Sequence, residues 1–267
     1  MSATAAADVL ATIVAAARRS VEVRRQEVPR DVLERAARAW TPRGAAMRQA
    51  LAGPGVNVIA ECKRRSPSKG ILRAQYDPVA IAAAYGAAGA TAISVLTEPA
   101  FFDGAPEHLQ AVRRSSNAFL LRKDFIVDEY QLAEAHAWGA DAVLLIVAAL
   151  DDSTLRALHD AATARGFAVL VEVHTAVELE RAQAAGATLI GVNSRNLKTL
   201  AVSIDTTLEL ASLIRSEAVA VAESGIRGRA DMDRLRAAGY DAFLIGERLM
   251  TQEDPGAALA GLLRGDG

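Results

Sequence analysis

The chain carries a glutamate and a lysine two positions apart, Glu61 and Lys63, at the end of the apolar run 56–63. In a β-strand, residues two apart point to the same face, so both side chains would project together where the strand ends. Opposite charges at such a place tune each other's proton affinity, which is what acid–base catalysis requires. For a Glu-x-Lys pair taken alone, a salt bridge that merely closes the strand is the simpler interpretation.

Later apolar runs carry further polar residues at or near their ends: Lys123, Glu172, Asn193 and Glu223. Alternation along each strand places these side chains on the inward face, at the last inward position of the strand. Charged groups gathered in this way are costly unless they are paired or used. We therefore interpret them as a catalytic cluster able to move protons. It sets three carboxylates against three cations: Glu61, Glu172 and Glu223 against Lys63, Lys123 and Arg195.

The elements that position these residues follow a repeat. Eight β-branched or leucine-rich runs alternate with alanine-rich helical segments, at 56–63, 91–97, 118–123, 142–148, 168–173, 188–193, 218–224 and 242–246. Several helical segments end in a glycine that supplies a left-handed C-cap, so the helix-to-strand turns are short. Strands that alternate with helices predict an α/β fold with a parallel sheet.

Eight such units in about 200 residues predict a closed (β/α)8 TIM barrel, whose reactive groups lie at the carboxyl ends of the strands. The alternative is a doubly wound open sheet, but no GxGxxG follows a strand to support a dinucleotide site. Residues 1–52 lie outside the repeat and form an N-terminal helical extension, with helices expected at 5–27 and 30–39. Residues 53–267 form the barrel, and the whole is one domain. Periodicity leaves open whether the extension caps the barrel bottom or covers the active face.

Composition limits the classes of partner. A formal net charge of −2 gives no basic surface for a nucleic acid or an anionic membrane, so a small molecule is the expected partner. The single cysteine, Cys62, excludes an internal disulfide, no Cys/His cluster has zinc spacing, and a cytoplasmic location is expected. The N-terminus carries Asp8 early and its arginines after the apolar stretch, unlike a signal peptide. No run is long enough to span a membrane.

A phosphate subsite is also indicated. Ser224 and Gly225 follow the seventh run, and Gly246 and Glu247 follow the eighth. In many barrels these two loops hold phosphate with backbone amides, and glycine lets the backbone approach closely.

Taken in order, the motifs resemble one family over nearly the whole chain. The matching strings are IAECKRRSPSKG (59–70), SVLTEPAFFDG (94–104), LLRKDFIVDEYQ (120–131), DAVLLIVAAL (141–150), VEVH (171–174), IGVNSRNLKTL (190–200), AESGI (222–226) and FLIGERLM (243–250). They resemble those of indole-3-glycerol phosphate synthase, a tryptophan-pathway enzyme. The resemblance implies a (β/α)8 barrel with its N-terminal helical extension over the catalytic face, and hence a lid.

The resemblance also implies an activity without a metal or organic cofactor. The family converts 1-(2-carboxyphenylamino)-1-deoxyribulose 5-phosphate to indole-3-glycerol phosphate, CO₂ and water. By motif, Lys123 is the general acid on the ketose carbonyl, and Glu172 is the base for dehydration. Lys63 lies by the leaving groups, Glu61 positions it, and Asn193 orients Glu61 and a substrate hydroxyl. Association with other tryptophan-pathway enzymes is left open.

Substrate contacts carry over in the same way. The resemblance assigns them to Ser66, Pro67, Phe102, Phe125, Arg195, Leu197, Glu223, Ser224, Gly225, Gly246 and Glu247. Phe102, Phe125 and Leu197 would form the apolar slot for the aromatic ring. Two residues depart from the family pattern. Cys62 replaces an aliphatic residue but points outward, and Glu247 stands where a small residue such as serine is common, so only its backbone amide is expected to bind phosphate.

Three alternatives are weighed against this assignment. A related phosphate-binding isomerase barrel shares the fold, but Glu61, Lys63 and Lys123 together argue against it. A Schiff-base aldolase would use Lys123 as a nucleophile. A catalytically silent interaction module has no need of the complete polar set.

Overall fold

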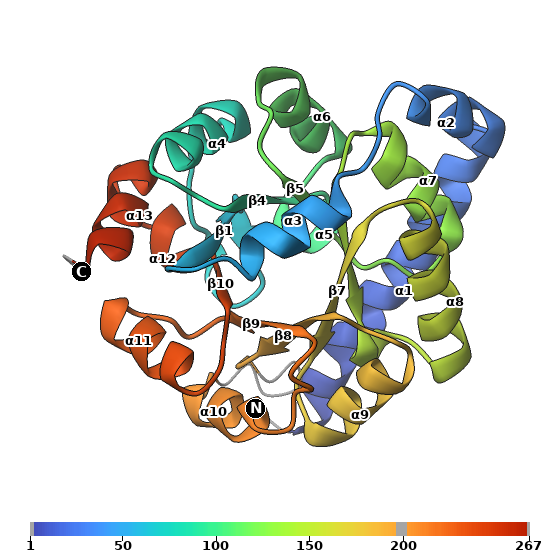
Figure 1. The fold of residues 1–267 in the computed structure, drawn as a ribbon. Helices are drawn as coiled ribbons and strands as arrows, with labels where there is room; N and C mark the ends of the chain where they lie inside the picture. Colours follow the sequence, from blue (N-terminus) through green and yellow to red (C-terminus); the bar gives the residue numbers. More distant parts are fainter. Residues whose placement is uncertain (1–2, 196–201, 266–267) are drawn as a thin grey trace.

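A computed structural model describes residues 3–195 and 202–265 as a closed barrel of eight parallel strands ringed by helices (Figure 1). The strands follow chain order around the barrel, and the last pairs with the first. They are β1 Asn57–Cys62, β4 Ala92–Leu96, β5 Leu120–Lys123, β6 Ala142–Ile146, β7 Ala168–Val173, β8 Leu189–Asn193, β9 Val219–Glu223 and β10 Ala242–Ile245. Each strand lies within the apolar run that predicts it, so the predicted (β/α)8 barrel is confirmed.

Helices connect the strands on the outside. They are α4 Pro78–Ala87, α6 Pro106–Ser115, α7 Glu129–Ala137, α8 Asp152–Ala164, α9 Ala176–Ala184, α10 Ile204–Ala211, α11 Arg229–Ala237 and α13 Pro255–Arg264. Short elements decorate the βα side: the hairpin β2 Arg65–Ser66 and β3 Gly70–Ile71, α5 Pro99–Phe102, the 3₁₀ turn η1 Val147–Ala149, and α12 Glu247–Met250. Gly89 and Gly239 have φ of 95° and 110°, which confirms the left-handed caps in the short αβ turns. No helix in these described ranges is long and apolar enough to cross a membrane.

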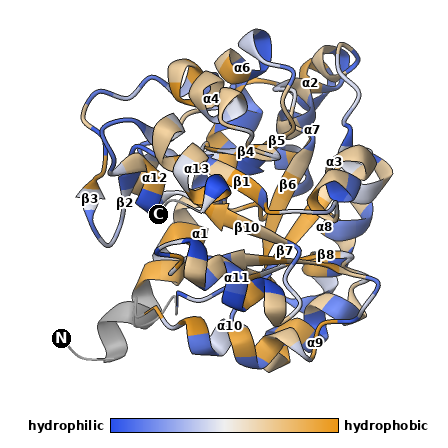
Figure 2. Ribbon diagram, turned by 60° about the vertical axis from the view of Figure 1, so that its left-hand side comes forward, coloured by the Kyte–Doolittle hydropathy of each residue, from blue (hydrophilic) through white to orange (hydrophobic). Residues whose placement is uncertain are grey.

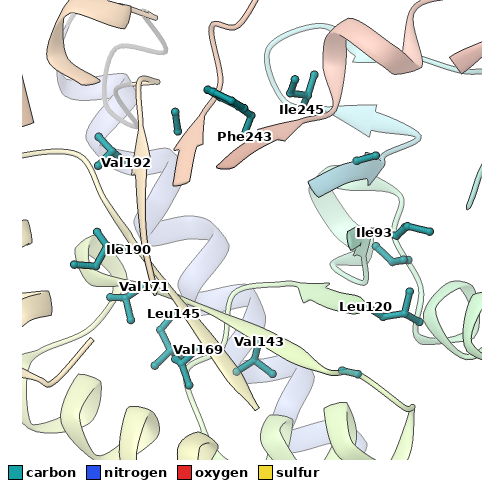
Figure 3. Close-up of a cluster of buried hydrophobic side chains, with 14 of the residues drawn as sticks. Ile93, Leu120, Val143, Leu145, Val169, Val171, Ile190, Val192, Phe243 and Ile245 are labelled. Atoms are coloured by element: carbon teal, nitrogen blue, oxygen red, sulfur yellow. The ribbon is translucent and has the colours of Figure 1, made fainter. Parts of the chain in front are cut away.

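Both faces of every strand are covered, which is why the runs are continuously apolar (Figure 2). The outward side chains form a cluster between the strands and the helices. Figure 3 shows part of it, including Ile93, Val171 and Phe243, pointing away from the barrel interior. Cys62 belongs to this outer cluster and is fully buried. It thus points outward as expected, and burial raises the pKa of its thiol.

The N-terminal extension covers both ends of the barrel. Helix α1 (Ala3–Glu27) brings Val9, Leu10 and Ile13 to the cavity at the carboxyl ends of the strands, which confirms the lid. A short helix α2 (Arg30–Ala37) then leads to α3 (Gly44–Leu51), which crosses the opposite end (Figure 1). The lid interpretation therefore describes α1, and the cap interpretation describes α3.

Helix α3 is not predicted from the sequence. It has only eight residues, and no side chain caps its N-terminus. Its stability comes from tertiary packing, because Met47 and Leu51 are fully buried in the inner core beneath Ile59. The Asn57 amide reinforces this contact by donating to the Leu51 carbonyl at 3.0 Å.

One buried carboxylate ties the extension to the barrel. Asp141, before β6, has no exposed surface. It accepts hydrogen bonds from the Arg43 guanidinium at 3.0 Å and the Arg113 guanidinium at 2.8 Å, and from the Leu120 amide at 3.0 Å. The Arg43 guanidinium also stacks over the Trp40 ring at 5.0 Å from its centroid. Removing this carboxylate would leave the positive charges of Arg43 and Arg113 facing each other without a negative charge between them.

We expect Asp141→Ala to lower the free energy of unfolding by about 3–5 kcal/mol, the usual effect of breaking a buried ion pair from one side. Urea unfolding measures the change. Asp152→Ala is the matched control, because the Asp152 side chain is 80% exposed in its pair with Arg181 and should contribute little. Equal, small losses for both variants would contradict the anchoring role of Asp141.

Candidate active site

A cavity of about 670 Å³ opens at the carboxyl ends of the strands, against α1. All the described residues predicted for the site line it: Glu61, Lys63, Ser66, Pro67, Phe102, Lys123, Phe125, Glu172, Asn193, Arg195, Glu223, Ser224, Gly225, Gly246 and Glu247. Leu197, predicted for the aromatic slot, lies outside the described residues. Residues from seven of the barrel strands or the loops that follow them thus meet in one place.

Lys123, the last residue of β5, is at the centre of the cavity's charges. Its Nζ lies 2.7 Å from Glu223 Oε2 and 3.3 Å from Glu172 Oε2, and both carboxylates are almost wholly buried. Burial alone would lower the pKa of Lys123, but the charges of Glu223 and Glu172 outweigh it and raise that pKa. The lysine is therefore an ammonium at neutral pH and can donate a proton.

The two carboxylates flanking Lys123 differ in their proton affinity. For Glu172, burial opposes ionisation, but Lys123 and His174 outweigh it and lower the pKa. For Glu223, burial and the neighbouring Glu172 charge raise the pKa in spite of Lys123. Two carboxylates whose environments push their pKa values apart are suited to opposite roles, one as base and one as acid.

Asn193 contacts a different partner from the one expected. Its side chain helps to lower the pKa of Glu172, and its Oδ1 accepts from the Arg195 amide at 3.0 Å. Among the described residues no hydrogen bond joins Asn193 to Glu61, so the role of Asn193 in orienting Glu61 stays a prediction. β8 and β7 are neighbouring strands, whereas β1 lies across the barrel, so Asn193 reaches Glu172 first.

Glu61 and Lys63 form the ion pair that a Glu-x-Lys at a strand end suggests, with Lys63 Nζ 2.5 Å from Glu61 Oε1. The pair nevertheless faces the cavity, and the Glu61 charge contributes to the raised pKa of Lys123. Gly246 on the neighbouring loop makes room for it, since a Cβ there would overlap Glu61 Oε1. The salt-bridge and catalytic interpretations are therefore compatible.

An apolar slot adjoins the charged cluster. The rings of Phe102 and Phe125 face each other with centroids 6.2 Å apart. Phe102 ends the short helix α5, whose first amides donate to the Glu98 carboxylate at 2.8–3.1 Å. With Leu10 and Ile13 of α1 on the cavity wall, the slot is lined for a flat aromatic group.

The other side of the cavity has the features of an anion subsite. Ser224 takes a left-handed φ of 65°, which is uncommon for a residue with a side chain, and Gly225 follows at 72°. Such strained backbone persists where function requires it. Glu247 is not turned away from the cavity, because it pairs with Lys69 Nζ at 2.9 Å and Arg195 at 3.5 Å. These cations offset its charge at the anion subsite.

Residue usage carries a further signal for the site. The chain contains four lysines against 26 arginines. Three of the four, Lys63, Lys69 and Lys123, line the cavity, and the fourth, Lys198, lies outside the described residues. An ammonium can donate a proton in a reaction, whereas a guanidinium cannot, so these few lysines are candidates for proton transfer. The scarcity of lysine in the sequence is the signal that could have identified Lys69, which is not among the predicted site residues.

His174 is the other residue missed from the sequence. It lies two positions after Glu172, and so on the same side of β7, with its ring between Glu172 and Glu178 of α9. Although burial lowers its pKa, the flanking carboxylates outweigh that effect and raise it to about 10. In the described part of the chain, no three His, Cys, Asp or Glu side chains are placed to hold a metal ion.

Comparison with known proteins is consistent with this geometry. A family model described as indole-3-glycerol phosphate synthase matches residues 10–262. Curated proteins of that name are similar to the chain: one from Azospirillum brasilense is 46% identical, covering 96% of this chain and 99% of that protein. One from Rhodococcus jostii is 52% identical, covering 86% of this chain and 85% of that protein.

Solved structures share the fold at low identity. Against 3-hexulose-6-phosphate synthase from Salmonella typhimurium, the TM-score is 0.62 at 15% identity, covering 78% of this chain and 99% of that one. Against thiamine phosphate pyrophosphorylase from Pyrococcus furiosus, it is 0.60 at 18% identity, covering 78% and 94%. At such identities these similarities concern the barrel alone.

The charge of His174 can be tested through stability. Its folded-state pKa of about 10 lies above the unfolded value of about 6.5, so its protonation stabilises the fold fully below about pH 6.5. That contribution is lost as the pH rises through about 10. We expect the difference in unfolding free energy between the protein and His174→Gln to shrink over this range, as measured by urea unfolding. A difference that does not depend on pH would contradict the protonated ring.

Proposed function

This chain belongs to the indole-3-glycerol phosphate synthase family, and we propose that it converts 1-(2-carboxyphenylamino)-1-deoxyribulose 5-phosphate to indole-3-glycerol phosphate, CO₂ and water. The observation that carries the proposal is the Lys123 ammonium, buried between Glu172 and Glu223 in a cavity that also offers an aromatic slot. The reaction needs an acid and a base close together, beside an apolar ring site and a phosphate site.

The aromatic slot and the anion subsite suggest one orientation for the substrate in the cavity. Its carboxyphenyl ring enters the slot between Phe102 and Phe125, beside Ser66 and Pro67. Its phosphate binds the loops after β9 and β10, where the backbone amides at Ser224, Gly225, Gly246 and Glu247 receive it. Lys69 and Arg195 already hold the Glu247 carboxylate there, and these cations become additional partners of the phosphate. The ketose carbonyl then lies over the central charged cluster.

Ring closure begins at Lys123. As the carboxyl-bearing ring carbon attacks the ketose carbonyl, the carbonyl oxygen takes a proton from Lys123 and becomes a hydroxyl group. The bond to the carboxylate then breaks, its electrons return to the ring, and CO₂ leaves. Lys63, held by Glu61, positions the substrate carboxylate before this step. The flanking carboxylates keep Lys123 protonated, so it holds the proton that a general acid must donate.

Dehydration completes the indole. The new hydroxyl group leaves as water with a proton from a cavity acid, and Glu172 removes the proton whose electrons form the ring double bond. Glu172 suits this role because it is ionised and hydrogen-bonded to Asn193. Glu223, whose pKa is raised, is the carboxyl group placed to hold a proton.

The Schiff-base aldolase alternative is weaker on the same geometry. A nucleophilic lysine must be neutral, and neutral lysines arise where burial or a nearby cation lowers the pKa. Lys123 has two carboxylates within 3.3 Å, which favour its charged form. We also propose that the reaction takes place in the cytoplasm, which a single buried thiol supports.

The test is turnover of the carboxyphenylamino ketose phosphate, followed by the fluorescence of the indole product. We expect product from the purified protein, and a loss of at least about a hundredfold in kcat for Lys123→Met, the scale of general acid catalysis. Circular dichroism and thermal unfolding check that the variant is folded. No product from the folded protein would refute the function, and near-normal turnover by the variant would remove Lys123 from its role.

A further inference from the structure

The reaction as assigned leaves two titratable residues beside Glu172 unused. His174 Nε2 lies 3.3 Å from Glu172 Oε1, and His174 Nδ1 lies 3.0 Å from Glu178 Oε2. The first separation is an ion-pair distance without the alignment of a hydrogen bond, and the second is a hydrogen bond. The ring is 9% exposed and so is shielded from solvent. A row of alternating charges thus runs from Glu178 through His174 and Glu172 to Lys123.

The far end of this row is fixed to the fold. Glu178 is in the first turn of α9, where its carboxylate also accepts from the His174 backbone amide at 2.8 Å. Thr175 caps the same turn, and its Oγ1 accepts from the Glu178 amide at 3.2 Å. The carboxylate therefore bonds both the backbone and the ring of His174, so the imidazole cannot turn without losing its hydrogen bond to Glu178.

Charge balance at Lys123 shows what the ring contributes. One ammonium faces two carboxylates and lies nearer to Glu223, at 2.7 Å, than to Glu172, at 3.3 Å. Without another cation, the shorter contact would favour ionised Glu223. His174 supplies that cation on one side only, so each Glu172 oxygen has a positive neighbour. Glu223 Oε1, by contrast, is buried without a hydrogen-bond partner among the described residues.

We propose that His174, held by Glu178, is a positioning residue that keeps the negative charge of the Lys123 cluster on Glu172 and leaves the proton to Glu223. This deepens the proposed function, because it determines which carboxyl group is the base and which is the acid. The charged groups that face the ring are Glu172 on β7 and Glu178 on α9, with Lys123 of β5 beyond Glu172. The contact between Glu178 and His174 thus affects catalysis as well as the start of α9.

The first test needs no substrate, so it is separate from the proposed function. The chain has four histidines, and ¹⁵N spectra of the imidazoles can be assigned by comparison with His174→Gln. We expect both ring nitrogens of His174 to carry protons at about pH 8, well above the ordinary histidine pKa of about 6.5. In Glu178→Gln, the midpoint of that titration should fall by at least about one pH unit. A neutral ring at that pH in the unaltered protein would overturn the proposal.

The second test is the pH dependence of turnover. We expect His174→Gln to lower kcat by about tenfold on the acid side of its pH profile, with KM changed less, because a larger fraction of Glu172 is protonated there. The apparent pKa of the acid limb of the kcat/KM profile should rise by about one unit or more, because Glu172 no longer has the His174 cation beside it. Glu178→Gln should shift the same apparent pKa in the same direction. If His174→Gln does not fold, the Glu178→Gln profile decides the test.

His159→Gln is the matched control, because His159 on α8 is equally buried at 9% exposed but lies beside Asp160, away from the cavity. Its pH profile should superimpose on that of the unaltered protein. If His174→Gln and Glu178→Gln keep the limbs of the unaltered protein, whatever their loss of rate, the role is structural and the proposal fails. If the unaltered protein turns over no substrate, the proposed function fails and the ¹⁵N titration decides this proposal.

Discussion

The pairing of one buried ammonium with two buried carboxylates is the constraint on which the rest of this structure depends. Lys123 reaches Glu172 and Glu223 because β5, β7 and β9 end at the same mouth of a closed barrel. Strand β8 runs between β7 and β9, and its Gly191 faces the site without a side chain. A Cβ at that position would overlap Glu223 Oε1. An open sheet, or any larger residue at 191, would separate the charges.

Burial makes this arrangement both expensive and useful. Charges removed from water are tolerated only when each has a partner, and inside the barrel their mutual attraction is stronger than in solvent. Helix α1 contributes Ile13 and its neighbours to one wall of the cavity, while α3 closes the other end of the barrel. Asp141 links the segment before α3 to the starts of β5 and β6. The extension thus covers both ends of the barrel around the charged cluster, in which Glu223 and Glu172 keep the proton on Lys123.

Much of this was accessible from the sequence, because the determining signals are local. Apolar runs and the glycines in the αβ turns predicted all eight strands, and alternation along those strands predicted the inward residues of the cluster. What could not be predicted depends on contacts distant in sequence. Helix α3 is stabilised by burial under β1. Asn193 affects Glu172 because β7 is the strand next to β8. His174 was not singled out from the sequence, because its role depends on the ring lying between Glu172 and Glu178 in the folded chain.

The ionisation state of Lys123 tests this account most directly. Only four lysines are present, so ¹³Cε resonances of labelled lysine can be followed by pH, with Lys123→Met assigning the one of interest. The carboxylates predict that Lys123 remains an ammonium up to and beyond the ordinary lysine pKa of about 10.4. A Lys123 resonance that titrates to the neutral amine by about pH 8 would contradict it, because such a lysine would be a nucleophile and not an acid.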